Sequence, residues 1–181
     1  MQARRLLDQS RAIFDNPQLP FADTAAQDGW RTGFASGAVW MRSVMGYVRN
    51  ETIPPVKADY NKLGIFKYGL ASVCALASGT FFVLLGWWPL LPLGVLVFYL
   101  VEAQMVFLFP LALDGLPVRT SRIWMQQAGG TLYVTWVVVQ LAAVMLFGGF
   151  AGNGFVRSWA LGCIAIVLWY EELRDAQNRI T

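Results

Sequence analysis

The chain has 181 residues, of which 56% are hydrophobic and 14% charged, and its formal net charge is +3. Soluble domains carry about 25% charged residues, so this composition excludes an ordinary soluble domain, a disordered tail and a secreted disulfide scaffold, and it predicts an all-α integral membrane protein. The chain contains no histidine, and its two cysteines lie apart in apolar runs, so we expect neither a metal centre nor another bound cofactor.

Residues 1–62 are predicted to form a cytoplasmic arm ahead of the membrane domain. No apolar stretch follows Arg4 and Arg5 before further charges, so the arm is not expected to be a cleaved signal peptide. Within it, residues 29–49 have the pattern of an amphipathic helix that lies in the membrane interface. We expect its polar face to contact water or the phosphates of anionic lipid head groups. That face carries Arg31, Arg42 and Arg49.

Three glycines in the same segment have the spacing found where helices pack closely together. They are Gly29, Gly33 and Gly37. On a helical wheel they fall on the apolar side, and small residues at this spacing let a second helix approach. We therefore predict that this face contacts protein. The alternative is a weak helix whose glycines face lipid, since each glycine lowers helix propensity by about 1 kcal/mol.

Two membrane spans are predicted after the arm. Between Lys67 and Asp114 lie 46 residues with a single charge, about twice the length that one transmembrane helix requires. A Trp-Trp-Pro turn at residues 87–89 divides this stretch into spans near residues 65–88 and 90–113. The sequence therefore predicts a helical hairpin.

Glu102 is the one charged residue in this stretch, and it is predicted to lie near the middle of the second span. An ionised carboxylate there costs at least about 2.5–3.5 kcal/mol, so we expect a partner. Gln140, at a similar depth in the third span, and Gln104 are candidates, because no Lys or Arg is expected at that depth. Two interpretations stay open: a proton, cation or substrate site, or a protonated carboxyl that joins helices.

A long uncharged stretch with a glycine-rich turn predicts a second hairpin, whose spans are residues 131–150 and 154–170. Four transmembrane helices in two hairpins are the expected result. This membrane domain is predicted to occupy residues 63–173, and a cytoplasmic tail, residues 174–181, follows it.

The distribution of positive charge predicts the orientation. Thirteen of the 14 Lys and Arg residues fall in the arm, at the start of the first span, in the central loop or in the tail; Arg157 is the exception. Cytoplasmic segments of membrane proteins are rich in Lys and Arg, so both termini and the central loop are predicted to be cytoplasmic, in a bacterial inner membrane. The expected partners are the bilayer with its anionic head groups and other membrane subunits or a second copy, but not nucleic acid.

The function predicted from these features is not enzymatic. The sequence contains no phosphate-binding loop, nucleophile elbow or paired-carboxylate motif, and no nucleophile or base accompanies Glu102. The sequence favours a scaffold or accessory subunit of a membrane complex. The alternative is a small homo-oligomeric transporter or channel that uses Glu102.

Overall fold

The computed structural model describes residues 2–16, 33–55 and 57–179, and within these ranges every regular element is a helix. The α-helices are α1 (Gln2–Phe14), α3 (Phe34–Arg49), α4 (Tyr60–Leu84), α5 (Pro92–Gln104), α6 (Leu108–Leu113), α7 (Ser121–Gln127), α8 (Gly130–Gly148) and α9 (Phe155–Asn178). Short 3-10 helices cover Trp88–Leu90 and Val118–Thr120, and a π-helical turn covers Gly149–Asn153. The predicted all-helical fold class is confirmed for this part of the chain.

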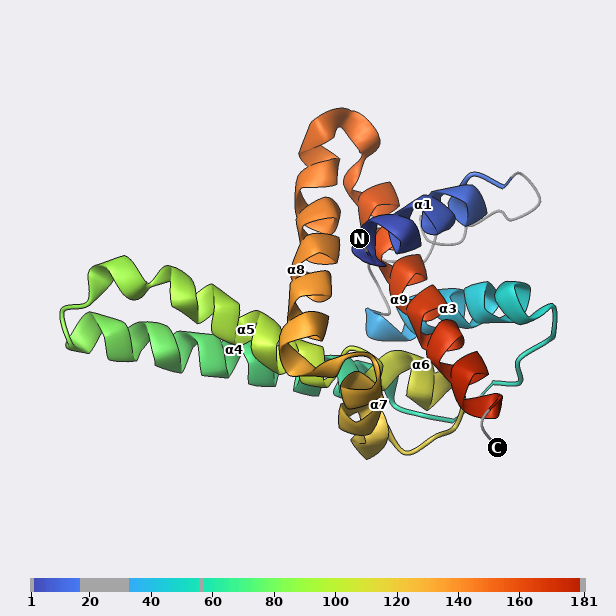
Figure 1. Cartoon of the computed structure of the whole chain (residues 1–181), viewed down its shortest axis with the longest axis horizontal. Helices are drawn as coiled ribbons and strands as arrows, with labels where there is room; N and C mark the ends of the chain where they lie inside the picture. Colours follow the sequence, from blue (N-terminus) through green and yellow to red (C-terminus); the bar gives the residue numbers. More distant parts are fainter. Residues whose placement is uncertain (1, 17–32, 56, 180–181) are drawn as a thin grey trace.

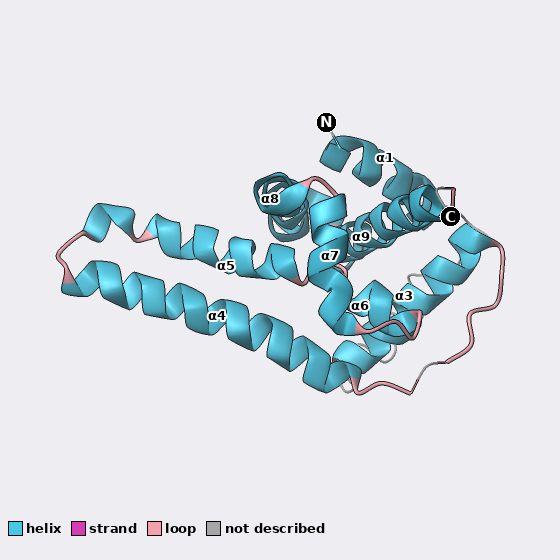
Figure 2. Cartoon of the chain, turned by 60° about the horizontal axis from the view of Figure 1, so that its bottom comes forward, coloured by secondary structure: helices cyan, strands magenta, loops and turns pink. Residues whose placement is uncertain are grey.

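Helices α4 and α5 pair as an antiparallel hairpin that projects away from the other helices (Figures 1 and 2). The pairing is close because α5 has a glycine at the contact: a β-carbon on Gly94 would lie 3.2 Å from the carbonyl oxygen of Ala75. Apolar side chains on the outside of the hairpin remain exposed, and that of Leu84 is 80% accessible. An apolar exterior of this kind is typical of helices that lie in lipid.

A turn at residues 105–107 divides the second predicted span into α5 and α6. Pro110 accounts for the break, because a proline has no N–H to donate to residue i−4 and its ring clashes with that residue's carbonyl. The helix resumes at Leu108, which places Pro110 in the first turn of α6, where N–H groups have no intrahelical partner. The prediction of one continuous helix over residues 90–113 is corrected accordingly.

Helices α8 and α9 form a second antiparallel hairpin, which runs across the direction of α4 and α5 rather than alongside them (Figure 1). Helices α1 and α3 pack against α9. The largest fully buried side chains are Tyr170, Phe107, Leu6, Met45 and Leu111. The core therefore lies where α1, α3, α6 and α9 meet, and not along the projecting hairpin.

Three segments of the described chain are long and apolar enough to cross a membrane, namely Tyr60–Leu84, Trp88–Leu113 and Gly130–Gly148. The prediction of a fourth span at residues 154–170 is wrong. In α9 only 13 residues separate the charges of Arg157 and Glu171. At about 1.5 Å per residue they cover about 20 Å, whereas the core of a bilayer is about 30 Å thick. Helix α9 instead buries apolar side chains against α1, α3 and α8.

Candidate functional site

A lysine and a glutamate meet inside the apolar hairpin. Lys67 Nζ of α4 lies 3.4 Å from Glu102 Oε1 of α5, and the two side chains are 3% and 13% exposed. The prediction that no basic residue lies at the depth of Glu102 is therefore wrong. A span that began near residue 65 would leave Lys67 at the membrane surface. Helix α4 begins at Tyr60 instead, because Asp59 caps it by accepting a backbone hydrogen bond of 3.0 Å from the first turn.

The register of the hairpin sets this pairing. Ala75 of α4 lies opposite Gly94 of α5. Eight residues further along each helix toward the open end of the hairpin, about two turns, Lys67 lies opposite Glu102. The antiparallel hairpin was predicted correctly. Folding one of its predicted spans back on the other would have brought Lys67 and Glu102 onto facing helices, and this was the signal in the sequence that could have found the pair.

The Lys67–Glu102 pair lies in the wall of a cavity of about 260 Å³ where α3, α4, α5, α6, α8 and α9 converge. The wall also includes Phe34, Trp40, Tyr68, Val138, Trp159 and Cys163. Among the described residues that line the cavity, Lys67 and Glu102 are the only charged ones. A molecule in this space would therefore meet one ion pair, with the hydroxyl group of Tyr68 beside Lys67, in otherwise largely apolar and aromatic surroundings.

Aromatic contacts build one wall of the cavity. The ring of Phe34 stacks on the rings of Tyr68 and Phe109, with centroid separations of 5.5 and 6.0 Å. Phe34 comes this close to α4 because Gly64 has no side chain, and a β-carbon there would overlap the ring. The ammonium group of Lys67 lies 5.1 Å from the centroid of Tyr68, within cation–π range. The wall is thus formed by packed side chains of α3, α4 and α6.

The two glutamines predicted as partners of Glu102 bind elsewhere. Gln104 Nε2 donates to Thr131 Oγ1 at the start of α8, at 3.2 Å. Gln140 Nε2 donates to the carbonyl oxygen of Trp136 in its own helix, also at 3.2 Å. A similar predicted depth did not bring Gln140 to Glu102, because α8 runs across the α4–α5 hairpin. The prediction that Gln140 or Gln104 is the partner of Glu102 is corrected, because the partner is Lys67.

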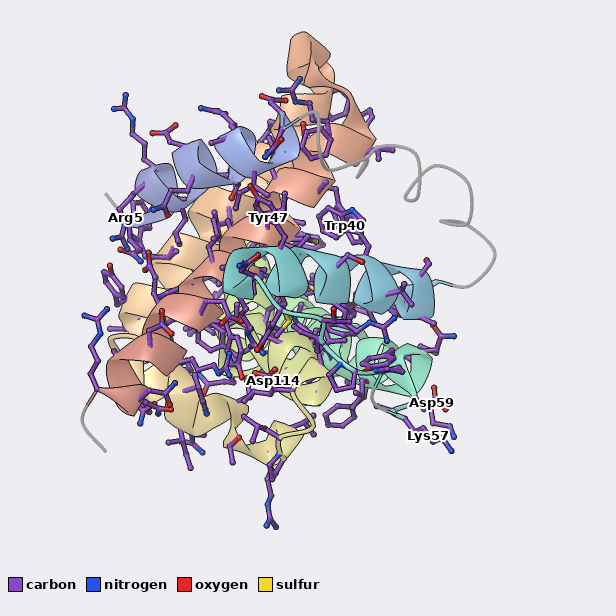
Figure 3. The ribbon with its side chains drawn as sticks, turned by 90° about the vertical axis from the view of Figure 1, so that its right-hand side faces the viewer. Arg5, Trp40, Tyr47, Lys57, Asp59 and Asp114 are labelled. Carbon is purple, nitrogen blue, oxygen red and sulfur yellow. The ribbon has the colours of Figure 1, made fainter. Side chains whose placement is uncertain are left out.

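A second charged cluster joins α3, α6 and α9. Arg49 donates to both oxygens of Asp114, at 2.7 and 2.8 Å, and to both oxygens of Glu171, at 2.9 and 2.6 Å. Tyr170 donates a further hydrogen bond of 2.5 Å to Asp114, which lies just below α3 in Figure 3. The Arg49 side chain is only 9% exposed. The prediction that Arg49 faces water or lipid phosphate is corrected, because carboxylates from two other helices occupy its guanidinium group.

These bonds keep Asp114 ionised. Burial alone would raise the pKa of Asp114, but the hydrogen bonds from Arg49 and Tyr170 and the charge of Arg49 outweigh it, so this pKa lies below its ordinary value. Burial, and then the bond to Asp114, raise the pKa of Tyr170, so its phenol remains a donor at neutral pH. None of these residues lines the cavity. We therefore assign the cluster to stability rather than to binding.

The other residues predicted to act in α3 take different positions. Arg42 is partly exposed, as predicted for the polar face, on a helix that is confirmed over residues 34–49. Gly33 precedes the helix, with a φ of +56° that favours glycine. A β-carbon on Gly37 would lie 3.7 Å from Trp159, an ordinary contact, so no close helix approach depends on it. Gly29 and Arg31 lie outside the described residues.

No protein-family model, curated protein or solved structure matches this chain. Among the described residues, no three His, Cys, Asp or Glu side chains gather where they could hold a metal ion. The cavity offers one ammonium and one carboxylate, which together donate and accept hydrogen bonds. This chemistry suits the binding of a small molecule.

Proposed function

We propose that this protein is a non-enzymatic multi-pass membrane protein that binds a small molecule at the Lys67–Glu102 pair. The proposal rests on one observation: a buried ion pair borders a cavity of about 260 Å³. Burial of two charges costs several kcal/mol per ion unless good geometry and further hydrogen bonds compensate. A bound molecule with a polar group would supply such hydrogen bonds.

The contrast with the Arg49 cluster supports a binding role. Arg49 makes four hydrogen bonds of 2.6–2.9 Å to two carboxylates, which is the geometry of a stabilising pair. Lys67 approaches one carboxylate oxygen at 3.4 Å, longer than the distance of about 2.7–2.9 Å typical of such bonds. An ammonium group has three N–H donors. Glu102 and the hydroxyl group of Tyr68 lie close to that of Lys67, so at least one donor is left for another group.

Filling the cavity tests the proposal. Ala142 of α8 lines the cavity, whereas the adjacent Ala143 is not among the lining residues. Ala142→Phe should therefore occupy the space, and Ala143→Phe is the matched control. After purification from membranes in a mild detergent, we expect wild type and Ala143→Phe to retain a small molecule by native mass spectrometry, and Ala142→Phe to lose it.

Circular dichroism and gel filtration establish that both variants are folded, and Ala142→Leu replaces Ala142→Phe if the larger side chain prevents folding. Equal retention by wild type and the two variants would contradict the proposal, as would a wild-type protein that retains no small molecule.

We also propose that the open end of the α4–α5 hairpin faces the cytoplasm. Basic residues lie near this end, both around the start of α4 and after α6. Cytoplasmic segments of membrane proteins are rich in Lys and Arg. Those near this end are Lys57, Lys62, Arg119 and Arg122. The C-terminal part of α9 belongs on the same side, because Glu171 binds Arg49 of the arm, so we propose that the α8–α9 hairpin starts and ends on the cytoplasmic side. Arg42, which is partly exposed on the same arm, suits contact with anionic head groups.

Cysteine labelling tests this orientation. In a chain whose Cys74 and Cys163 are replaced by Ala, we introduce Gln2→Cys or Trp87→Cys. Trp87 is at the tip of the hairpin and 52% exposed. A membrane-impermeant maleimide should label Trp87→Cys in intact cells, and Gln2→Cys only after permeabilisation. The opposite pattern would refute the orientation.

A scaffold or accessory subunit is the second candidate function, and the outer face of α4 favours it. Gly69, Ser72 and Thr80 are exposed there at helical spacing, and small or hydroxyl-bearing residues are typical of faces that pack on another transmembrane helix. A stoichiometric second polypeptide in the same purification would favour this function.

Transport through Glu102 is the alternative function. Flux into proteoliposomes that Glu102→Gln abolishes without loss of stability would favour it.

A further inference from the structure

We infer that the cavity binds an uncharged, apolar molecule whose hydroxyl group donates a hydrogen bond to Glu102 and accepts one from Lys67. This inference rests on the proposed function and adds the chemical class of the ligand. The charge of the cavity, the spacing of its polar atoms and the nature of its walls each point to this class.

The charge of the cavity favours an uncharged ligand. The ammonium of Lys67 and the carboxylate of Glu102 balance each other, and among the described residues that line the cavity no further charge is present. A carboxylate or ammonium ligand would therefore bring an unbalanced charge into apolar surroundings. Uncompensated charge is expensive to bury, whereas a neutral molecule avoids this cost.

The spacing of the two polar atoms favours a hydroxyl group. Lys67 Nζ and Glu102 Oε1 are 3.4 Å apart, so one oxygen atom can lie at about 2.8 Å from both, which is an ordinary hydrogen-bond length. A hydroxyl carries one donor and two acceptor lone pairs. It can therefore accept from the ammonium and donate to the carboxylate at once, while an ether or a ketone can only accept.

The walls of the cavity favour an apolar body, in particular a ring. Phe34, Tyr68, Phe109 and Trp159 surround the space with aromatic faces and edges, which attract rings in offset or edge-to-face arrangements. A cavity of about 150 Å³ already accepts benzene, so about 260 Å³ accommodates a substituted ring. Such a molecule partitions into the bilayer, which would supply it.

A matched set of brominated probes tests the ligand class. We compare 4-bromophenol, 4-bromoanisole and 4-bromobenzoate at pH 7 with the full chain in detergent. Bromine quenches tryptophan fluorescence, and Trp40 and Trp159 line the cavity. Ala142→Phe, whose cavity is filled, corrects for quenching by probe dissolved in the micelle. We expect saturable quenching by 4-bromophenol and binding at least about tenfold weaker for the other two, because each lacks the hydroxyl donor.

Variants that change the charge of the cavity provide a second, independent test. In Glu102→Gln the cavity carries one positive charge, so 4-bromobenzoate should now bind at least about tenfold more tightly than it does to wild type. In Lys67→Gln the cavity carries one negative charge, so protonated 4-bromobenzylamine should gain affinity to a similar degree. Each variant tests the inference independently, and one suffices if the other does not fold.

The possible failures are distinct. If 4-bromoanisole or 4-bromobenzoate binds wild type as tightly as 4-bromophenol, the inferred ligand class is wrong, but the proposal that the cavity binds a small molecule is supported. If every probe quenches the tryptophan fluorescence of wild type and Ala142→Phe equally, both the inferred ligand class and the proposed binding function are refuted.

Discussion

Replacement of Arg49 by Gln is expected to lower the free energy of unfolding by about 3–5 kcal/mol, because removal of one partner leaves buried charges without compensation. Arg49 links Asp114 at the end of α6 to Glu171 of α9, while the partly exposed Arg174 reaches only Glu171, at 3.3 Å. Both carboxylates are almost inaccessible, with 11% and 7% of their side chains exposed. Without the guanidinium group these two negative charges would face each other across the core. Chemical unfolding in detergent micelles, followed by circular dichroism, measures the loss.

The control for this prediction is Arg42→Gln, seven residues earlier in α3. Arg42 is partly exposed, so its loss should change stability by no more than about 0.5 kcal/mol. Equal effects of the two substitutions would show that the Arg49 cluster does not stabilise the fold.

The pH dependence of stability provides a second measurement on the same variant. The folded-state pKa of Asp114 lies below its ordinary value, so its contribution is fully present above the unfolded-state pKa of about 3.9. It is lost as the pH falls through the lower folded-state pKa. Wild type should therefore lose stability in acid below about pH 4. Arg49→Gln, in which only Tyr170 and Arg174 still lower the pKa of Asp114, should lose less over the same range.

Replacement of Lys67 by Met is expected to be as damaging, about 3–5 kcal/mol, whereas the double variant Lys67→Met/Glu102→Met should regain most of the lost stability. The single substitution leaves the Glu102 carboxylate in an apolar wall without a counter-charge. The double substitution removes both charges and keeps side chains of similar volume, and such replacements of buried pairs are often neutral or stabilising. Thermal unfolding of the single and double variants in micelles measures the interaction.

Lys62→Met is the matched control for this pair. Lys62 lies on the same helix and pairs with Asp59 at 3.0 Å, but its side chain is 85% exposed. Exposed ion pairs contribute about 0–1 kcal/mol, so this substitution should have little effect. A double variant that is less stable than either single variant at Lys67 or Glu102 would show that the two charges do not compensate each other.

The helical hairpins follow from local features of the sequence. The first span was predicted near residues 65–88 and is a helix at Tyr60–Leu84; the third was predicted near residues 131–150 and is a helix at Gly130–Gly148. Long uncharged runs and the turns that end them lie within one segment, so hydropathy and turn residues locate them without any knowledge of neighbours. The number of spans was overestimated because the short uncharged stretch of α9 resembles a span in composition.

The candidate site was only half predictable. Glu102 stands out in the sequence because it is the one charge within 46 residues. Its partner depends on where α4 begins and on the register of the hairpin, since a shift of two residues in either helix turns a side chain to another face. The cavity needs all six of its helices in place, and its aromatic residues lie far apart in the sequence.

What the sequence determined by itself is the helical class, the apolar hairpin and the isolated acid, because each depends on the composition of one segment. What only the tertiary structure decided is which charges meet. Arg49 looked like a surface residue on a helical wheel, yet it binds carboxylates 65 and 122 residues away in the chain. A wheel describes one helix, whereas burial and ion pairing depend on the helices that pack against it, and these are set by the energetics of the whole core.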